Sequence, residues 1–435
     1  MTGQRPDPAW LAGRSRNAAA ELRAATSATH LVRDRAGFGW RLSPARGSIL
    51  ASARMDSWDP DPDYFHHWVR DAAIALAAVP MAMEADPDAR GFWRQAVADH
   101  IDFSLRISDP ERSGPATNPV AAGTRPDHRA FLRPDAELAA LSGARWLEEP
   151  RFAADGSPDL ENWSRPQDDG PALRASVLMT LRKVMPEAAT AAADRLIERD
   201  LAHVLAIAGR PAIGPWEEAP PKRTTFTLIA QWDALDRAAT WADERGQPAE
   251  PWRAAAEKVA ALVFMARDPA SGAWRQSVEA PEGTLDSATV LAILHAGRAT
   301  GPFALSAAST QATVAGLERT FAELYPLNRG RSAPAIGRWP GDTYFGGNPW
   351  YPTTLGFAEL HYRIATLTGD PAPFARAEAW MRLVEELAPD PALPLPEQCD
   401  RTTGAATSCP ALTWSAAAFL GAAAARADAV QALAR

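Results

Sequence analysis

The sequence predicts an all-α protein whose helices form an inner and an outer ring. Apolar residues recur at helical spacing over many segments rich in Ala, Leu and Arg, and alternating β-branched runs are few. Segments rich in polar and aromatic residues precede the second, fourth, sixth, tenth and twelfth predicted helices. If odd and even helices alternate between two rings, all even helices begin at one end of a toroid. The loops that precede them would then converge into one site.

About twelve helical segments support this prediction. They begin near residues 14, 69, 90, 170, 186, 223, 249, 286, 308, 352, 371 and 410. The segment Trp252–Met265 is typical, because Trp252, Val259 and Val263 fall on one face and charged residues lie elsewhere. Leu412–Ala425 is apolar all round, which indicates a buried inner helix.

Long irregular stretches separate some of these helices. They span residues 34–66, 108–133, 146–168, 268–285, 325–351 and 389–409. Loops of this length in a compact domain are usually functional.

Charge and hydropathy exclude several classes of protein. The net charge of −8 and the isoelectric point near 5.6 give no basic surface for nucleic acid. No apolar run approaches the roughly 20 residues that span a bilayer. Met1–Pro8 lacks the hydrophobic stretch of a signal peptide, so we expect a cytoplasmic protein. In that reducing compartment Cys399 and Cys409 are expected as thiols rather than as a disulfide.

Two acidic signals lie far apart in the chain, Trp216-Glu217-Glu218 and Pro396-Glu397-Gln398. Two carboxyl groups in unlike surroundings are what cleavage of a glycosidic bond requires, since one protonates the leaving oxygen while the other activates water or attacks the sugar. Either Glu motif alone would carry little information, because charged residues mostly lie on solvated surfaces.

Segments rich in Trp and Arg strengthen this interpretation. The chain has 16 Trp against five Tyr. Trp93, Trp252 and Trp380 lie within helical patterns and are expected in the core. An exposed role in sugar binding is expected for Trp residues in polar or Gly- and Pro-bearing segments, because an indole offers a flat apolar face and one N–H. These are Trp68, Trp163, Trp216, Trp350 and Trp414.

Two segments look like binding loops. Asp61–Asp71 ends in Arg70 and Asp71, a donor and an acceptor that could hold neighbouring sugar hydroxyls. The alternative is that Asp71 merely helps to cap a helix beside a surface Arg. Gly337–Tyr351 combines aromatic residues, an Arg and several Gly, which is poor material for a core element.

Together these motifs resemble glycoside hydrolase family 15, the glucoamylases and their relatives. The matching segments occur in the family's order: Gly47–Ser52, Tyr64–Trp68, Arg70–Asp71, Arg165–Gln167, Asp169–Arg174, Trp216–Glu218, Gly337–Trp350, Glu397–Gln398, Asp400 and Leu412–Ser415.

The resemblance implies an (α/α)6 toroid and an inverting exo-hydrolase that releases β-glucose from the non-reducing ends of α-glucosides. It assigns Glu217 as the general acid and Glu397 as the general base. Arg70 and Asp71 would hold the far hydroxyls of the terminal glucose, and Glu218 and Arg338 would bind hydroxyls across the scissile bond. The pocket walls would be Tyr64, Trp68, Trp163, Trp216, Trp350 and Trp414.

The resemblance also implies no metal and no cofactor, and the sequence shows no metal-ligating motif. No Ser/Thr-rich linker or all-β module is evident, so we expect one catalytic domain over residues 1–435 without an appended starch-binding module. A monomer is expected, with an oligosaccharide bearing a terminal α-glucose as its substrate.

Three departures from the family's pattern concern the leaving-sugar side. Gly214-Pro215 stands where an acidic residue and Leu usually precede Trp-Glu-Glu, Pro396 where Ser usually precedes the base, and Gly341 where an acidic residue is common. The linkage preference therefore stays open among maltooligosaccharides, isomaltose-type α-1,6 substrates and trehalose. A glucosyltransferase on the same scaffold is an alternative, as is a silent sugar-binding protein, although the presence of both Glu residues disfavours the latter.

Overall fold

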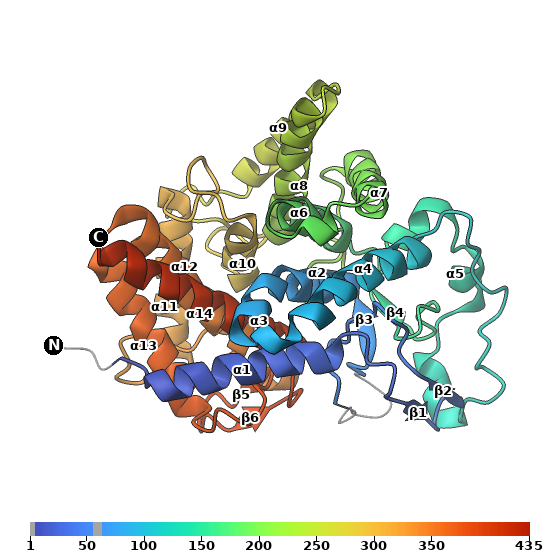
Figure 1. Cartoon of the computed structure of the whole chain (residues 1–435), viewed down its shortest axis with the longest axis horizontal. Coiled ribbons are helices and arrows are strands. Elements are labelled where there is room, and N and C mark those ends of the chain that lie inside the picture. The colour runs from blue at the N-terminus through green and yellow to red at the C-terminus, as the bar shows by residue number, and fades with distance from the viewer. Residues whose placement is uncertain (1–4, 55–62) are drawn as a thin grey trace.

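The structure is a computed structural model and describes residues 5–54 and 63–435 (Figure 1). Within these residues an inner ring is built from six helices, each of which packs against the next. Because α14 also packs against α2, the ring is closed. The inner helices are α2 (Val69–Ala77), α6 (Asp169–Val184), α8 (Thr225–Glu244), α10 (Ser287–Ala296), α12 (Tyr351–Thr368) and α14 (Thr413–Leu433).

An outer layer of helices covers this ring. Its members are α1 (Pro8–Ala25), α4 (Arg90–Ile107), α7 (Ala191–Ile207), α9 (Glu250–Met265), α11 (Ala308–Leu324) and α13 (Pro371–Leu387). Helix α1 packs on α14, α7 on α6, α9 on α8, α11 on α10 and α13 on α12, while α4 packs on α7. The predicted alternation of inner and outer helices is confirmed, and the fold is an all-α (α/α)6 toroid.

Burial follows this arrangement. Helix α10 buries every residue except His295, whereas the outer helix α9 buries only Ala256, Val259 and Val263. Neighbouring inner helices approach closely where side chains are small. A Cβ added at Gly421 of α14 would lie 2.6 Å from an oxygen of Glu359 in α12.

Three two-stranded antiparallel sheets lie in the loops. They pair β1 (Arg33–Arg35) with β2 (Trp40–Leu42), β3 (His66–Trp68) with β4 (Arg151–Ala153), and β5 (Gln398–Cys399) with β6 (Ala406–Thr407). The second sheet matters most for the site, because its register sets Trp68 opposite Arg151 immediately before α2 begins.

The remaining elements are short. They are the helices α3 (Val79–Ala85) and α5 (Asp135–Ala139) and the 3-10 turns η1 (Pro87–Ala89), η2 (Pro126–Phe131), η3 (Gly143–Leu147), η4 (Pro186–Ala188), η5 (Pro326–Asn328) and η6 (Tyr344–Gly346).

Some predicted helix starts were wrong. The first helix begins at Pro8 rather than near residue 14, because the side chain of Asp7 accepts a hydrogen bond from the Ala9 N–H and caps it. The helix expected near residue 186 is the 3-10 turn η4, and α7 begins only at Ala191. The helix that begins at residue 69 ends at Ala77, and α3 follows with Pro80 in its first turn, where the missing N–H is tolerated.

Within the described ranges, no helix combines the length and the apolar composition needed to cross a membrane. The structure gives Cys399 and Cys409 as buried thiols, as expected. Burial raises the pKa of the Cys399 thiol to about 12.

Candidate active site

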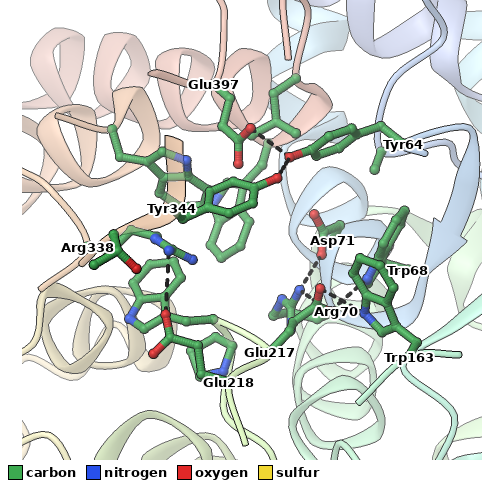
Figure 2. Close-up of a pocket in the computed structure, with 17 residues that line it drawn as sticks. Tyr64, Trp68, Arg70, Asp71, Trp163, Glu217, Glu218, Arg338, Tyr344 and Glu397 are labelled. Carbon is green, nitrogen blue, oxygen red and sulfur yellow. Dashed lines mark hydrogen bonds and ion pairs between the residues drawn. The ribbon is translucent and has the colours of Figure 1, made fainter. Parts of the chain in front are cut away.

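A pocket of about 400 Å³ opens where the inner helices begin, a size typical of small-molecule sites (Figure 2). All of the sequence-predicted site residues line it: Tyr64, Trp68, Arg70, Asp71, Trp163, Trp216, Glu217, Glu218, Arg338, Trp350, Glu397 and Trp414. Asp61 and Pro62 of the first predicted binding segment lie outside the described residues. Segments separated by more than 300 positions thus meet in one cavity, as the toroid requires.

Glu217 stands on one side of the pocket in a tight turn. Its backbone N–H donates to the Gly214 carbonyl at 2.9 Å, and its φ of +63° is uncommon for a residue other than Gly. The hydroxyl of Ser164 donates to the Glu217 carbonyl at 2.6 Å. The backbone is therefore held from two directions, and the carboxyl group projects into the cavity.

Four donors converge on the Glu217 carboxyl group. Trp68 Nε1 donates to Oε1 at 2.7 Å, and Trp163 Nε1 donates to Oε2 at 2.9 Å. Oε1 also accepts from Gln167 Nε2 at 3.1 Å and from Arg70 Nη2 at 3.3 Å. Oε2 therefore has a single partner among the described residues, whereas Oε1 has three.

Arg70 and Asp71 lie at the inner end of the pocket, on the same side as Glu217. Arg70 Nη2 lies 3.1 Å from an Asp71 oxygen, and Arg70 Nη1 donates to Gln167 at 3.0 Å and to Asp169 at 3.5 Å. Burial raises the pKa of Asp71 to about 6, against the opposing effect of Arg70. The alternative reading placed Asp71 beside a surface Arg, which is wrong because Arg70 is buried, although Asp71 does lie in the first turn of α2.

Glu397 stands on another side of the cavity with Tyr64 beside it (Figure 2). Its Oε2 accepts from Tyr64 Oη at 2.8 Å, from the Ser408 hydroxyl and from the Cys409 N–H at 3.5 Å. Its Oε1 accepts no hydrogen bond from the described residues. One carboxylate oxygen is thus fixed by the protein while the other stays available.

A second tyrosine extends this group. The hydroxyls of Tyr64 and Tyr344 are 2.6 Å apart. Burial and the nearby Glu397 raise the pKa of both phenols above the usual value, so both hydroxyls keep their protons. Tyr64 can therefore donate to Glu397 while it accepts from Tyr344.

Three indoles form a continuous wall. Trp216 and Trp350 meet edge to face at 5.1 Å between ring centroids, and Trp350 and Trp414 at 5.0 Å. The prediction that these Trp residues are exposed is wrong, since they are 9%, 4% and 3% exposed, and Trp68 is buried as well. Each indole covers its neighbour and still presents part of its surface to the pocket.

The mouth of the pocket is more polar. Glu218 is 46% exposed, and its Oε1 lies 3.5 Å from Arg338 Nη2. The same oxygen accepts from Trp339 Nε1 at 3.4 Å. A Cβ at position 341 would lie 2.2 Å from the Trp339 ring, so the Gly341 departure is what admits the indole.

Sequence reasoning missed several residues at the site. Tyr344 and Gln167 belong to segments that were recognised, and their side-chain chemistry was the available signal. Ser408 and Asp286 carried no such signal. Asp286 caps α10 and accepts the Trp216 indole N–H at 2.8 and 3.0 Å, which fixes the ring next to Glu217.

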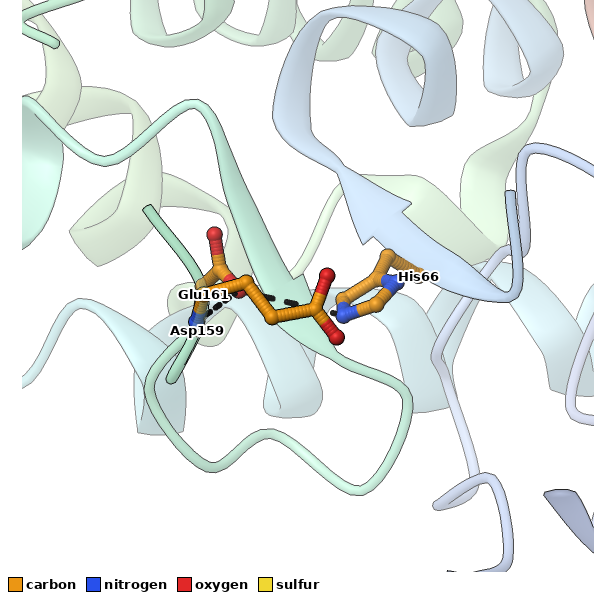
Figure 3. Close-up of side chains that lie close together, drawn as sticks. All are labelled: His66, Asp159 and Glu161. Carbon is orange, nitrogen blue, oxygen red and sulfur yellow. Dashed lines mark hydrogen bonds and ion pairs between the residues drawn. The ribbon is translucent and has the colours of Figure 1, made fainter. Parts of the chain in front are cut away.

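A cluster behind the pocket has the composition of a metal site. Ligand atoms of His66, Asp159 and Glu161 lie within 4.8 Å of one another (Figure 3). Guanidinium groups already occupy the two carboxylates, since Arg151 pairs with both at 2.9 and 3.1 Å and Arg165 pairs with Asp159 at 2.7 Å. Burial and Arg151 lower the pKa of His66 to about 4. Positive charge thus takes the place that a cation would need.

Comparison with known proteins gives consistent results. The family model described as "Glycosyl hydrolases family 15" matches residues 139–372, more than half of the chain. Glucoamylase-1 of Arthroderma benhamiae is 26% identical over 431 residues, which cover 88% of this chain and 64% of the relative. The chain therefore spans less than two thirds of that relative's length.

Solved structures agree with the fold. The glucoamylase of Hormoconis resinae superposes with a TM-score of 0.75 at 25% identity, covering 96% of this chain and 73% of that one. The glucoamylase of Saccharomycopsis fibuligera superposes with a TM-score of 0.74 at 21% identity, covering 98% and 97% of the two chains. At that identity the second comparison supports the fold alone.

Proposed function

This chain belongs to glycosyl hydrolases family 15, and from that premise we propose that it is an inverting exo-hydrolase that releases β-glucose from the non-reducing ends of α-glucosides. The observation that carries the proposal is the pair Glu217 and Glu397, which line one pocket and have entirely different hydrogen-bond partners. Two carboxyl groups in unlike environments can take the roles of acid and base.

Glu217 is the proposed general acid. Of its two oxygens, Oε2 has the Trp163 N–H as its single partner within residues 5–54 and 63–435 and so has room for a proton. A proton on this oxygen would pass to the glycosidic oxygen as the bond to C1 breaks. The three donors on Oε1 hold the carboxyl plane so that Oε2 keeps its direction.

Glu397 is the proposed general base. Tyr64 and Ser408 fix its Oε2, which leaves Oε1 to accept a proton from water. That water would attack C1 from the face opposite the leaving group, and the sugar product would have the β configuration. An inverting pair requires about 6.5–9.5 Å between its carboxyl groups so that the water fits.

Exo action is supported by the inner end of the pocket. Arg70 and Asp71 are buried there and offer a fork of donors beside an acceptor. These groups suit adjacent hydroxyls of a terminal glucose ring, and the indole wall suits its apolar face.

We take the whole chain as one catalytic unit, because all six inner helices contribute to one ring.

The leaving sugar would meet Glu218 and Arg338 at the mouth. Gly341, which leaves room for the Trp339 indole, makes this side differ from the family's usual pattern, so the substrate class proposed is a short α-glucoside with the linkage left to experiment.

The test is proton NMR of the protein with maltose, isomaltose and trehalose in parallel, following the anomeric signals of the first glucose released. From maltose or isomaltose we expect an initial excess of β-glucose over the share carried by the substrate's own reducing end, and from trehalose equal amounts of α- and β-glucose, because its second glucose leaves as the α anomer. An initial excess of α-glucose would contradict the inverting pair, and new oligosaccharide signals would favour a glucosyltransferase.

Variants then test the two roles. Glu217→Gln and Glu397→Gln are each expected to lower kcat by about 10²–10⁴-fold, the usual contribution of general acid–base catalysis, while leaving the thermal unfolding midpoint near that of the unmodified protein. Near-normal turnover by either variant would overturn the assignment.

A further inference from the structure

The buried guanidinium of Arg151 lies against both indoles that hold the proposed acid. It lies 3.8 Å from the ring centroid of Trp163 and 5.0 Å from that of Trp68. These are the two indoles whose N–H groups donate to Glu217. We propose that Arg151 is a positioning residue for the general acid, acting on Glu217 through Trp163 and Trp68; this inference rests on the proposed function.

The position of Arg151 is itself tightly determined. Strand pairing sets it opposite Trp68 in the β3–β4 sheet, and its side chain is completely buried. Its Nε donates to Asp159 at 2.9 Å and its Nη2 to Glu161 at 3.1 Å. A guanidinium held by two buried carboxylates cannot move without leaving a buried charge uncompensated.

The carboxylates are held in turn by two further guanidinium groups. Asp159 also accepts from Arg165 at 2.7 Å, and Glu161 from Arg35 at 2.8 Å. A series of contacts therefore runs from the cluster in Figure 3 through Arg151 and the indoles of Trp163 and Trp68 to the Glu217 carboxyl group. Each of the four carboxylate oxygens of Asp159 and Glu161 accepts a hydrogen bond from a guanidinium group, which accounts for the composition of the cluster.

Two physical effects follow from this arrangement. A cation over an indole face is attracted to the ring, so Arg151 fixes the tilt of both rings and hence the direction of both N–H groups. The two indoles meet edge to face at 5.9 Å, so a shift of one displaces the other. Because Trp163 supplies the one partner that Glu217 Oε2 has in the described part of the chain, the orientation of the proton-bearing oxygen depends on this support.

The experiment compares Arg151→Met and Arg151→Lys with the unmodified protein on two substrates. One is the disaccharide that the protein hydrolyses fastest, whose leaving sugar needs a proton. The other is α-glucosyl fluoride, whose leaving group is a stable anion that needs little help from an acid. Glucose and fluoride release are measured separately, and kcat and KM are determined for each.

The matched control is Arg174→Met. Arg174 forms an equally buried pair with Asp200, at 2.6 and 2.8 Å, between α6 and α7. It makes no cation–π contact with any described indole. Its loss therefore reproduces the damage of removing a buried guanidinium without touching the indoles that hold Glu217.

Arg151→Met is expected to lower kcat on the disaccharide by about 100-fold, the effect of misplacing a catalytic group by about 1 Å, and to lower kcat on the fluoride by less than about tenfold. Arg174→Met is expected to change both rates by the same factor. Arg151→Lys keeps the charge but not the planar fork of the guanidinium. We therefore expect an intermediate loss of kcat that is again larger for the disaccharide than for the fluoride.

If Arg151→Met does not fold, the Lys variant carries the test. Equal losses on the two substrates, or a loss in KM alone, would overturn the positioning role. An unmodified protein that hydrolyses neither substrate would overturn the proposed function itself, and this inference with it.

Discussion

Replacing Tyr64 with Phe isolates the contact that orients the proposed base. The substitution removes one hydroxyl, which donates to Glu397 Oε2 at 2.8 Å and lies 2.6 Å from the Tyr344 hydroxyl. A hydrogen bond to a charged group contributes about 1.5–3 kcal/mol. Because the contact sets the direction in which the free Glu397 oxygen meets the attacking water, we expect its contribution to be lost from the transition state and not from the bound substrate. kcat then falls by roughly 10- to 150-fold, at about 1.4 kcal/mol for each factor of ten.

Tyr344→Phe is the matched control. It removes a hydroxyl from the same pair, but that hydroxyl contacts Tyr64 rather than Glu397. A neutral hydrogen bond contributes about 0.5–1.5 kcal/mol, so the expected loss in kcat is only about 2- to 10-fold.

The assay is steady-state hydrolysis of the best disaccharide, with kcat and KM determined for both variants and urea unfolding as a check on stability. A Tyr64→Phe variant with normal kcat would refute the role of this contact. So would a larger loss of kcat in Tyr344→Phe than in Tyr64→Phe.

Three further substitutions test other parts of the structure. Burial raises the pKa of Asp71 to about 6, so the unfolded chain ionises first and the stability contributed by Asp71 falls as pH rises from about 4 to 6. Asp71→Asn should therefore gain about 2 kcal/mol relative to the unmodified protein between pH 4 and pH 7 in urea unfolding, and a constant difference would contradict this. Gly341→Ala places a Cβ 2.2 Å from the Trp339 ring, so we expect it to displace the indole and raise KM for disaccharides several-fold; unchanged kinetics would mean that the indole does not shape the mouth. Gly170→Ala brings a Cβ to 2.8 Å from the stiff side chain of Val69, and we expect it to lower the free energy of unfolding by about 1–3 kcal/mol, with a loss below 0.5 kcal/mol showing that α2 and α6 can separate.

The fold could be predicted because its determinants are local and repeated. Amphipathic and fully apolar helices alternate along the chain, and that alternation is enough to indicate two rings. Helix boundaries were less accurate where a cap or a proline decided them, as at Asp7 and Pro80. Both residues can be read in the sequence, but the apolar pattern does not show whether a cap or a proline outweighs it in setting the helix boundary.

The members of the site were predictable, and their environments were not. Sequence motifs predicted which residues meet in the pocket, because each lies just before an inner helix or in its first turn. The partners of Glu217, such as the indoles of Trp68 and Trp163, depend on side-chain directions that are set only when distant loops meet. Arg151 was invisible for the same reason, since its importance lies in two ring faces that it touches and not in its neighbours in the chain.

Backbone strain within the described residues concentrates near the two proposed catalytic carboxyl groups. Only four residues other than Gly have positive φ there, namely Ser27, Glu217, Phe345 and Ser408. Glu217 carries the proposed acid, and Ser408 donates to the proposed base. Such conformations cost about 1–3 kcal/mol each and persist only where the surroundings over-determine them. A closed ring of buried helices supplies that constraint, because the loops of Glu217, Phe345 and Ser408 lead into α8, α12 and α14, inner helices that each pack against two neighbours. Closure of the toroid therefore does more than enclose the pocket. It holds the loops that orient the two carboxyl groups in strained backbone conformations, which an isolated loop would not keep.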